Sequence, residues 1–258
     1  MNIGISTACL YPMETEKALE TVGKLGVSAV EIFINAPSEL RTDFLKNLKA
    51  ICDFYAMNII AIHPYSSGFE PFMFFTNYER RFQDAMTMYE DYYHAANLLG
   101  AKIVVLHGDR KEGLLPDEVY YDRFGEMFLH AKRHDVILAQ ENVERCRSRS
   151  SAFIWHMYEY LKDDVRFVLD LKQAIRSGED IFAMYKAMAK GLVHVHLSDH
   201  NSKEDCLAPG SGIFNFAEFE KHLKADCYKG LGVIELYRSN YKSAADLYKS
   251  YCWLKAIQ

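Results

Sequence analysis

The chain has 258 residues, of which 50% are hydrophobic, so it is long enough to form one large core. Its 30 Lys and Arg residues are outnumbered by 35 Asp and Glu residues, which argues against a nucleic-acid partner. The six cysteines include no C-x-x-C pair, which indicates reduced thiols in a cytoplasmic protein. The N-terminus does not resemble a signal peptide, and no apolar run is long enough to cross a membrane.

Short apolar and β-branched runs alternate with longer stretches of helical periodicity along the whole chain. We expect strands at residues 2–6, 29–34, 58–63, 101–107, 135–141, 165–170, 192–199 and 231–236. We expect helices at 14–25, 38–55, 77–99 and 117–133, and further helices that end near 161, 190, 224 and 255. Ser38 is expected to cap the second helix, and residues 64–76 are expected to form a long aromatic-rich loop.

The apolar strands are nearly continuous, which is typical of parallel strands whose two faces are both covered. Eight strand–helix units over this length favour a (β/α)8 TIM barrel of the α/β class over a doubly wound sheet. No Pro- or Ser-rich linker interrupts the chain, so we expect a single domain over residues 1–258. No G-x-G-x-x-G motif or P-loop indicates a nucleotide cofactor.

Seven of the eight predicted strands end, or nearly end, in His, Asp or Glu. One such residue is often only a helix cap or a solvated loop residue. In a barrel, however, the carboxyl ends of the strands form one mouth, where active sites are built. We therefore expect one site from Glu31, His63, His107, Glu141, Asp170, His196 and Glu235.

Carboxylates buried together repel one another, and a divalent cation removes that conflict. Three carboxylates and one imidazole form a ligand set that suits Mn²⁺, Mg²⁺ or Co²⁺ and also accepts Zn²⁺; these ligands are Glu141, Asp170, His196 and Glu235. His63 and His107 could hold a second, zinc-like metal or could contact the substrate. His194 shares a strand face with His196, and we expect it to support that ligand from below.

Short motifs in this order along the chain resemble the xylose isomerase-like barrel superfamily. The motifs are IAIHPY, VVLHGD, AQENV, VLDLKQA, HVHLSD, APGSG and VIELY. The superfamily contains sugar epimerases, hydroxypyruvate isomerases, inosose dehydratases and endonuclease IV. The resemblance implies that the four residues above are the shared metal ligands and that Glu141 and Glu235 form the acid/base pair.

The predicted function is metal-dependent isomerisation or epimerisation of a small sugar, polyol or keto-acid. A metal chelated by neighbouring carbonyl and hydroxyl oxygens acidifies the C–H bond between them and stabilises the enediolate. Two flanking carboxylates can then remove and return the proton. An inosose-type dehydratase starts with the same proton abstraction and remains an alternative. A barrel that binds a sugar without turnover would not need two opposed glutamates.

Endonuclease IV-like phosphodiesterase activity is a further alternative, but the chain departs from that pattern. The resemblance places Gln173 where a third-metal histidine belongs, and Glu204–Asp205–Cys206 where a D-x-H motif belongs. The tagatose-epimerase type also differs, because it has a histidine at the position of Gln173 and an arginine at that of Ser202. These departures predict a site without a third metal.

The remaining candidates could bind the substrate. Glu31 lies at a strand end, and Gln173 could bond to a substrate hydroxyl or only begin a helix. Lys172 and Arg238 lie beside ligand positions, where they could meet an acidic or phosphorylated substrate or remain solvated. The aromatic side chains of residues 64–76 could line the site or form a contact of a homodimer or homotetramer.

Overall fold

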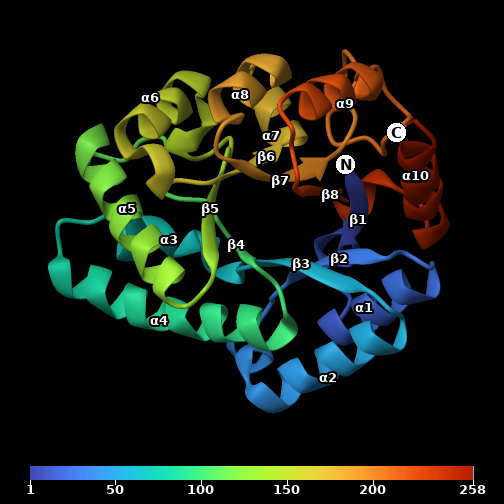
Figure 1. Cartoon of the computed structure of the whole chain (residues 1–258), viewed down its shortest axis with the longest axis horizontal. Coiled ribbons are helices and arrows are strands. Elements are labelled where there is room, and N and C mark those ends of the chain that lie inside the picture. Colours follow the sequence, from blue (N-terminus) through green and yellow to red (C-terminus); the bar gives the residue numbers. More distant parts are fainter. Residues whose placement is uncertain (258) are drawn as a thin grey trace.

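The computed structural model describes residues 1–257 and shows a closed barrel of parallel strands, paired in chain order from β1 to β8. Strands β1 and β8 pair with each other and close the barrel (Figure 1). The strands are β1 (Asn2–Ser6), β2 (Ala29–Phe33), β3 (Asn58–His63), β4 (Ile103–Leu106), β5 (Ile137–Glu141), β6 (Phe167–Asp170), β7 (Leu192–Leu197) and β8 (Leu231–Ile234). The predicted TIM barrel is confirmed.

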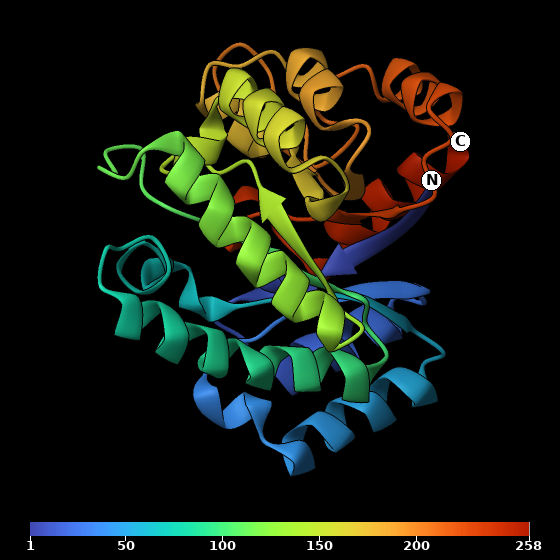
Figure 2. The same ribbon diagram turned by 60° about the vertical axis from the view of Figure 1, so that its left-hand side comes forward.

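Helices surround the barrel, and Figure 2 shows α4 and α5 running side by side on its outer surface. In the described residues 1–257, no helix is long and apolar enough to span a membrane. The helices are α1 (Thr15–Lys24), α2 (Thr42–Phe54), α3 (Glu70–Met73), α4 (Glu79–Leu99), α5 (Asp117–Arg133), α6 (Ser151–Leu161), α7 (Leu171–Arg176), α8 (Ile181–Met188), α9 (Phe216–Ala225) and α10 (Ala244–Ala256).

Three connections differ from the prediction. Ser38 lies in a 3₁₀ turn rather than at a helix cap, and α2 begins after it. The expected loop at 64–76 contains a 3₁₀ turn and α3. The expected single helix between β6 and β7 is two helices, because Gly178 has a φ of 72° and a left-handed residue cannot continue a right-handed helix.

The side chains inside the barrel lie in layers, and the polar layer is the one at the mouth. Residues two apart in a strand point to the same side. Glu141 therefore stands above Ala139, Asp170 above Val168, and both lower side chains belong to one small apolar cluster. That cluster consists of Ala29, Ile60, Ala61, Ile103, Val105, Ala139, Val168 and Val233. The polar layer thus lies directly above a packed layer of apolar side chains, as in other TIM barrels.

Candidate metal centre

Four strand-end side chains meet at the mouth of the barrel. Glu141, Asp170, His196 and Glu235 each offer a ligand atom, and these atoms all lie within 4.8 Å of one another. Nδ1 of His196 lies 3.2 Å from Oε1 of Glu141, 3.7 Å from Oδ2 of Asp170 and 3.3 Å from Oε2 of Glu235. All four residues are buried. The barrel therefore gathers the ligand set that was expected from residues far apart in the chain.

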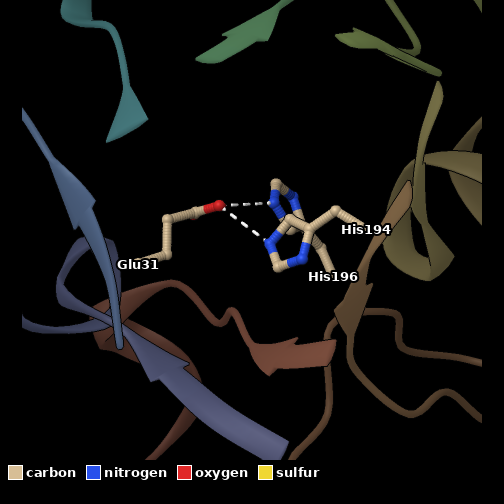
Figure 3. A group of neighbouring side chains, drawn as sticks. All are labelled: Glu31, His194 and His196. Atoms are coloured by element: carbon tan, nitrogen blue, oxygen red, sulfur yellow. Dashed lines mark hydrogen bonds and ion pairs between the residues drawn. The ribbon is translucent and has the colours of Figure 1, made fainter. Parts of the chain in front are cut away.

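Glu31 fixes the orientation of His196 from across the barrel (Figure 3). Oε2 of Glu31 lies 3.1 Å from Nε2 of His196 and 3.0 Å from Nε2 of His194, and Oε1 accepts a hydrogen bond from Ser6 Oγ. Burial raises the pKa of Glu31, but His196 and His194 outweigh this effect and hold it well below its usual range. An ionised carboxylate can only accept hydrogen bonds, so Nε2 of His196 carries the proton.

Nδ1 of His196 points at three carboxylates. Burial lowers the pKa of His196, but Glu235 and Glu31 outweigh this effect and raise it well above its usual value, so a bound metal ion would take the place of the Nδ1 proton. An imidazole whose other nitrogen donates to a carboxylate is the usual support of a metal-binding histidine. The structure therefore revises the expectation for Glu31. Its side chain is fully buried below the centre, where it orients His196 and cannot reach a substrate. His194 lies beside it and supports the same carboxylate, with its other nitrogen 3.1 Å from the Leu231 carbonyl.

The four central residues fit a divalent cation. Burial raises the pKa of Glu141, but His107, His196 and His63 outweigh it and hold that pKa well below its usual range. Oε2 of Glu141 is buried, and Nε2 of His107 and Nε2 of His63 lie 2.8 Å and 3.6 Å from it. Three buried carboxylate groups and one imidazole nitrogen form the donor set that hard to intermediate divalent metals prefer.

Lys172 lies at the edge of the centre. Its Nζ donates to Oδ2 of Asp170 and Oε2 of Glu235, and only 4% of its side chain is exposed. Burial lowers the pKa of Lys172, but Asp170 and Glu235 outweigh this and raise it well above its usual range. The ammonium is therefore buried rather than solvated. It neutralises part of the charge of the two carboxylates, and Lys172 also lines the cavity described below.

His63 and His107 lie beside Glu141, with Nε2 of His107 2.8 Å and Nε2 of His63 3.6 Å from its Oε2. Nη2 of Arg145 lies 3.1 Å from Nδ1 of His107. A guanidinium only donates, so Nδ1 of His107 is the acceptor in this contact. Nδ1 of His63 is buried and has no partner among residues 1–257. Neither ring has the acceptor that usually supports a metal-binding histidine, which favours substrate contact.

A cavity of about 400 Å³ opens above these residues, a volume typical of small-molecule sites. Other hollows of similar size lie among the described residues, but none of them is lined by a strand-end residue. The cavity is lined by Ala8, Tyr11, Phe33, Asn35, His63, Tyr65, Ser67, His107, Glu141, Arg145, Lys172, Gln173, Glu235, Leu236 and Tyr237.

Some predicted substrate residues line this cavity and others do not. Gln173 lines it, and its Oε1 accepts the backbone N–H of Glu144 at 3.0 Å. Arg238 does not, because its guanidinium is turned toward the carbonyls of Tyr241 and Lys242. Asn35 and Arg145 also line the cavity. The strand pattern of the sequence does not indicate either residue, because both lie in loops.

The residues at the expected third-metal positions have other partners. Asp205 pairs with the guanidinium of Arg176, with Oδ1 2.8 Å from Nη2. Cys206 is buried and accepts the backbone N–H of Tyr237. Gln173 supplies an amide rather than an imidazole. None of Gln173, Asp205 and Cys206 belongs to a group of possible metal ligands within residues 1–257.

Glu31→Gln should weaken metal binding by about 10- to 100-fold, the range seen when such supporting partners are lost. The amide cannot accept from both histidines as strongly as the carboxylate, so His196 loses its fixed orientation. A competition titration with a chromophoric chelator measures the change for Mn²⁺. Glu39→Gln is the control, because Glu39 bonds to Thr15 and the Asn35 backbone and not to the centre. Equal Mn²⁺ affinity in wild type and Glu31→Gln would contradict the assignment.

The structure is a TIM barrel with a carboxylate–imidazole cluster at the carboxyl ends of its strands, and this cluster could hold a metal ion. The family described as xylose isomerase-like TIM barrel matches residues 19–257 of this chain. The chain therefore belongs to that family, and the resemblance inferred from its motifs is confirmed.

Individual relatives are distant but cover nearly the whole chain. An uncharacterized protein of Mycobacterium leprae is 25% identical over 95% of this chain and 92% of its own length. Fructoselysine 3-epimerase of Shigella flexneri is 20% identical over 92% of this chain and 90% of its own length. The crystal structure of a D-tagatose 3-epimerase-like protein has a TM-score of 0.80 at 21% identity, and the match covers 100% of this chain and 97% of that one.

Proposed function

We propose that this protein is a metal-dependent isomerase or epimerase of a small sugar, polyol or keto-acid. One observation carries the proposal: Glu141 and Glu235 both line the cavity and both contribute to the four-residue centre. Two carboxylates that face one cavity can remove a proton from a bound substrate and return it. The naming of the Shigella flexneri relative as a 3-epimerase supports this class of reaction.

The proposed cofactor is one divalent ion, Mn²⁺, Mg²⁺, Co²⁺ or Zn²⁺, held by Glu141, Asp170, His196 and Glu235. When bound, such an ion withdraws electrons from adjacent carbonyl and hydroxyl oxygens and so acidifies the C–H bond between them. The geometry around His63 and His107 supports a single ion, because neither ring has a supporting acceptor for metal ligation. We assign these two histidines to substrate contact instead.

The protein's own residues provide the rest of the proposed chemistry. Glu141 and Glu235 carry depressed pKa values: burial opposes the shift in both, while His107 and His196 lower that of Glu141, and Lys172 and His196 lower that of Glu235. Both are therefore ionised and able to accept a proton. Tyr65 and Tyr237 line the cavity, and such side chains exclude water from an enediolate that water would otherwise protonate without control.

Solvent isotope exchange tests this proposal. The protein is stripped with EDTA, reloaded with each of the four ions, and incubated in D₂O with D-fructose, D-tagatose or an inosose. We expect deuterium to enter the carbon next to the carbonyl of at least one compound, only in the reloaded protein. Product analysis separates an epimer or isomer from the dehydrated product of an inosose-type lyase. Exchange that survives EDTA would contradict a metal-dependent reaction.

A further inference from the structure

Arg145 is an exposed residue in the lining of the cavity, and both its backbone and its guanidinium have partners. It lies in the loop after β5, and its carbonyl accepts the backbone N–H of Lys111 at 3.0 Å. Its Nη2 donates to Nδ1 of His107 at 3.1 Å and to Oγ of Ser67 at 3.1 Å. Two segments therefore contact the guanidinium, and a third is bonded to the backbone of Arg145. A side chain held in this way loses little further entropy when it binds a ligand.

Arg145 has no carboxylate partner within residues 1–257: no carboxylate oxygen lies within 4.0 Å of its guanidinium nitrogens, and its hydrogen bonds are made by Nη2. The adjacent Glu144 pairs with Lys111 instead. Other cationic side chains near the site are paired, as Arg176 is with Asp205. A guanidinium cannot lose its proton, and its planar fork matches a carboxylate or a phosphate.

Acidic and basic side chains therefore both line the cavity. Glu141 and Glu235 form one end, where the proposed proton transfer occurs, and Arg145 and Ser67 form another part of the wall. Only the imidazole of His107 separates Glu141 from Arg145, with contacts of 2.8 Å and 3.1 Å on its two nitrogens. A molecule of a few carbon atoms can thus contact both Glu141 and Arg145.

The lining also includes a buried acceptor, on Asn35 in the loop after β2. Nδ2 of Asn35 donates to Thr15 Oγ1 and to the Phe33 carbonyl, so its Oδ1 must serve as an acceptor. That Oδ1 is buried and has no partner among residues 1–257, although Asn35 lines the cavity. A buried acceptor without a donor is costly, and a substrate hydroxyl would satisfy it.

We infer that Arg145 and Ser67 form a subsite for an anionic group, either a carboxylate or a phosphate, so that the substrate is an acidic or phosphorylated sugar derivative. This inference rests on the proposed function, since it concerns the substrate of the same site. It assigns the anion to Arg145, whereas Lys172 is already paired with two carboxylates and Arg238 lies outside the cavity.

Calorimetric titration of the Mn²⁺-loaded protein with D-fructose, D-fructose 6-phosphate and D-fructuronate tests the inference. We expect at least one anionic probe to bind about tenfold or more tightly than D-fructose, because hydrogen bonds between charged groups are strong. The phosphate and carboxylate probes show which anion the subsite takes. Arg145→Met should remove that preference, measured as the ratio of the affinity for the anionic probe to the affinity for D-fructose in the same variant.

Arg110→Met is the matched control. Arg110 lies on the neighbouring loop over the Phe72 ring and outside the cavity, so this variant should keep the preference. Equal affinity for all three probes, including uniformly undetectable binding, would overturn the inference, as would a preference retained by Arg145→Met. Failure of the proposed function is distinguishable, because it appears as metal-independent isotope exchange rather than as a loss of anion preference.

Discussion

Glu141→Gln and Glu235→Gln should each lower the rate of isotope exchange by about 10³-fold, within the range for loss of a general acid or base. The amide has nearly the same shape as the carboxylate but cannot accept the proton. Each variant should also bind the divalent ion more weakly, because a charged ligand becomes neutral. Exchange rates measured at saturating Mn²⁺, together with elemental analysis of bound metal, separate these two effects.

Glu144→Gln is the control for this pair of variants. Glu144 lies three residues after Glu141, but its carboxylate pairs with Lys111 and does not line the cavity. This variant should keep both its bound metal and its exchange rate. If Glu141→Gln and Glu235→Gln leave metal stoichiometry and all sugar turnover unchanged, the proposed mechanism is wrong.

Lys172→Met should lower the free energy of unfolding of the metal-free protein by about 3–5 kcal/mol, as expected when one member of a buried charge pair is removed. The ammonium of Lys172 contacts Asp170 and Glu235, and its loss leaves both carboxylates buried without that partner. Added Mn²⁺ should restore most of this stability, because the ion supplies the missing positive charge and binds only the folded state. Denaturant unfolding with EDTA and with Mn²⁺ measures both quantities.

The comparison for Lys172 is Lys111→Met, which removes a lysine from an exposed pair with Glu144. Exposed pairs contribute about 1 kcal/mol or less, so this variant should unfold almost as the wild type does, and Mn²⁺ should stabilise both equally. A metal-free Lys172→Met protein as stable as the wild type would show that the ammonium does not compensate the two carboxylates.

Much of the fold and of the centre follows from the order of residues alone. Each strand is a short apolar run that ends near a His, Asp or Glu, as with Glu141 on β5 and His196 on β7. Parallel strands in a barrel present their carboxyl ends at one mouth, so local pattern and fold class together place Glu141, Asp170, His196 and Glu235 in one cluster. The ligand set was therefore predictable without any knowledge of side-chain contacts.

Which side chains support the site and which line the cavity could be seen only in the closed barrel, not in the sequence. Glu31 and His196 are 165 residues apart in sequence, and their contact exists because β2 and β7 face each other across the interior. Lys172 turns inward to two carboxylates, while Arg145 reaches the cavity from a loop. Strand periodicity carries no information about such contacts, because they depend on distances between elements that the chain brings together only when it folds.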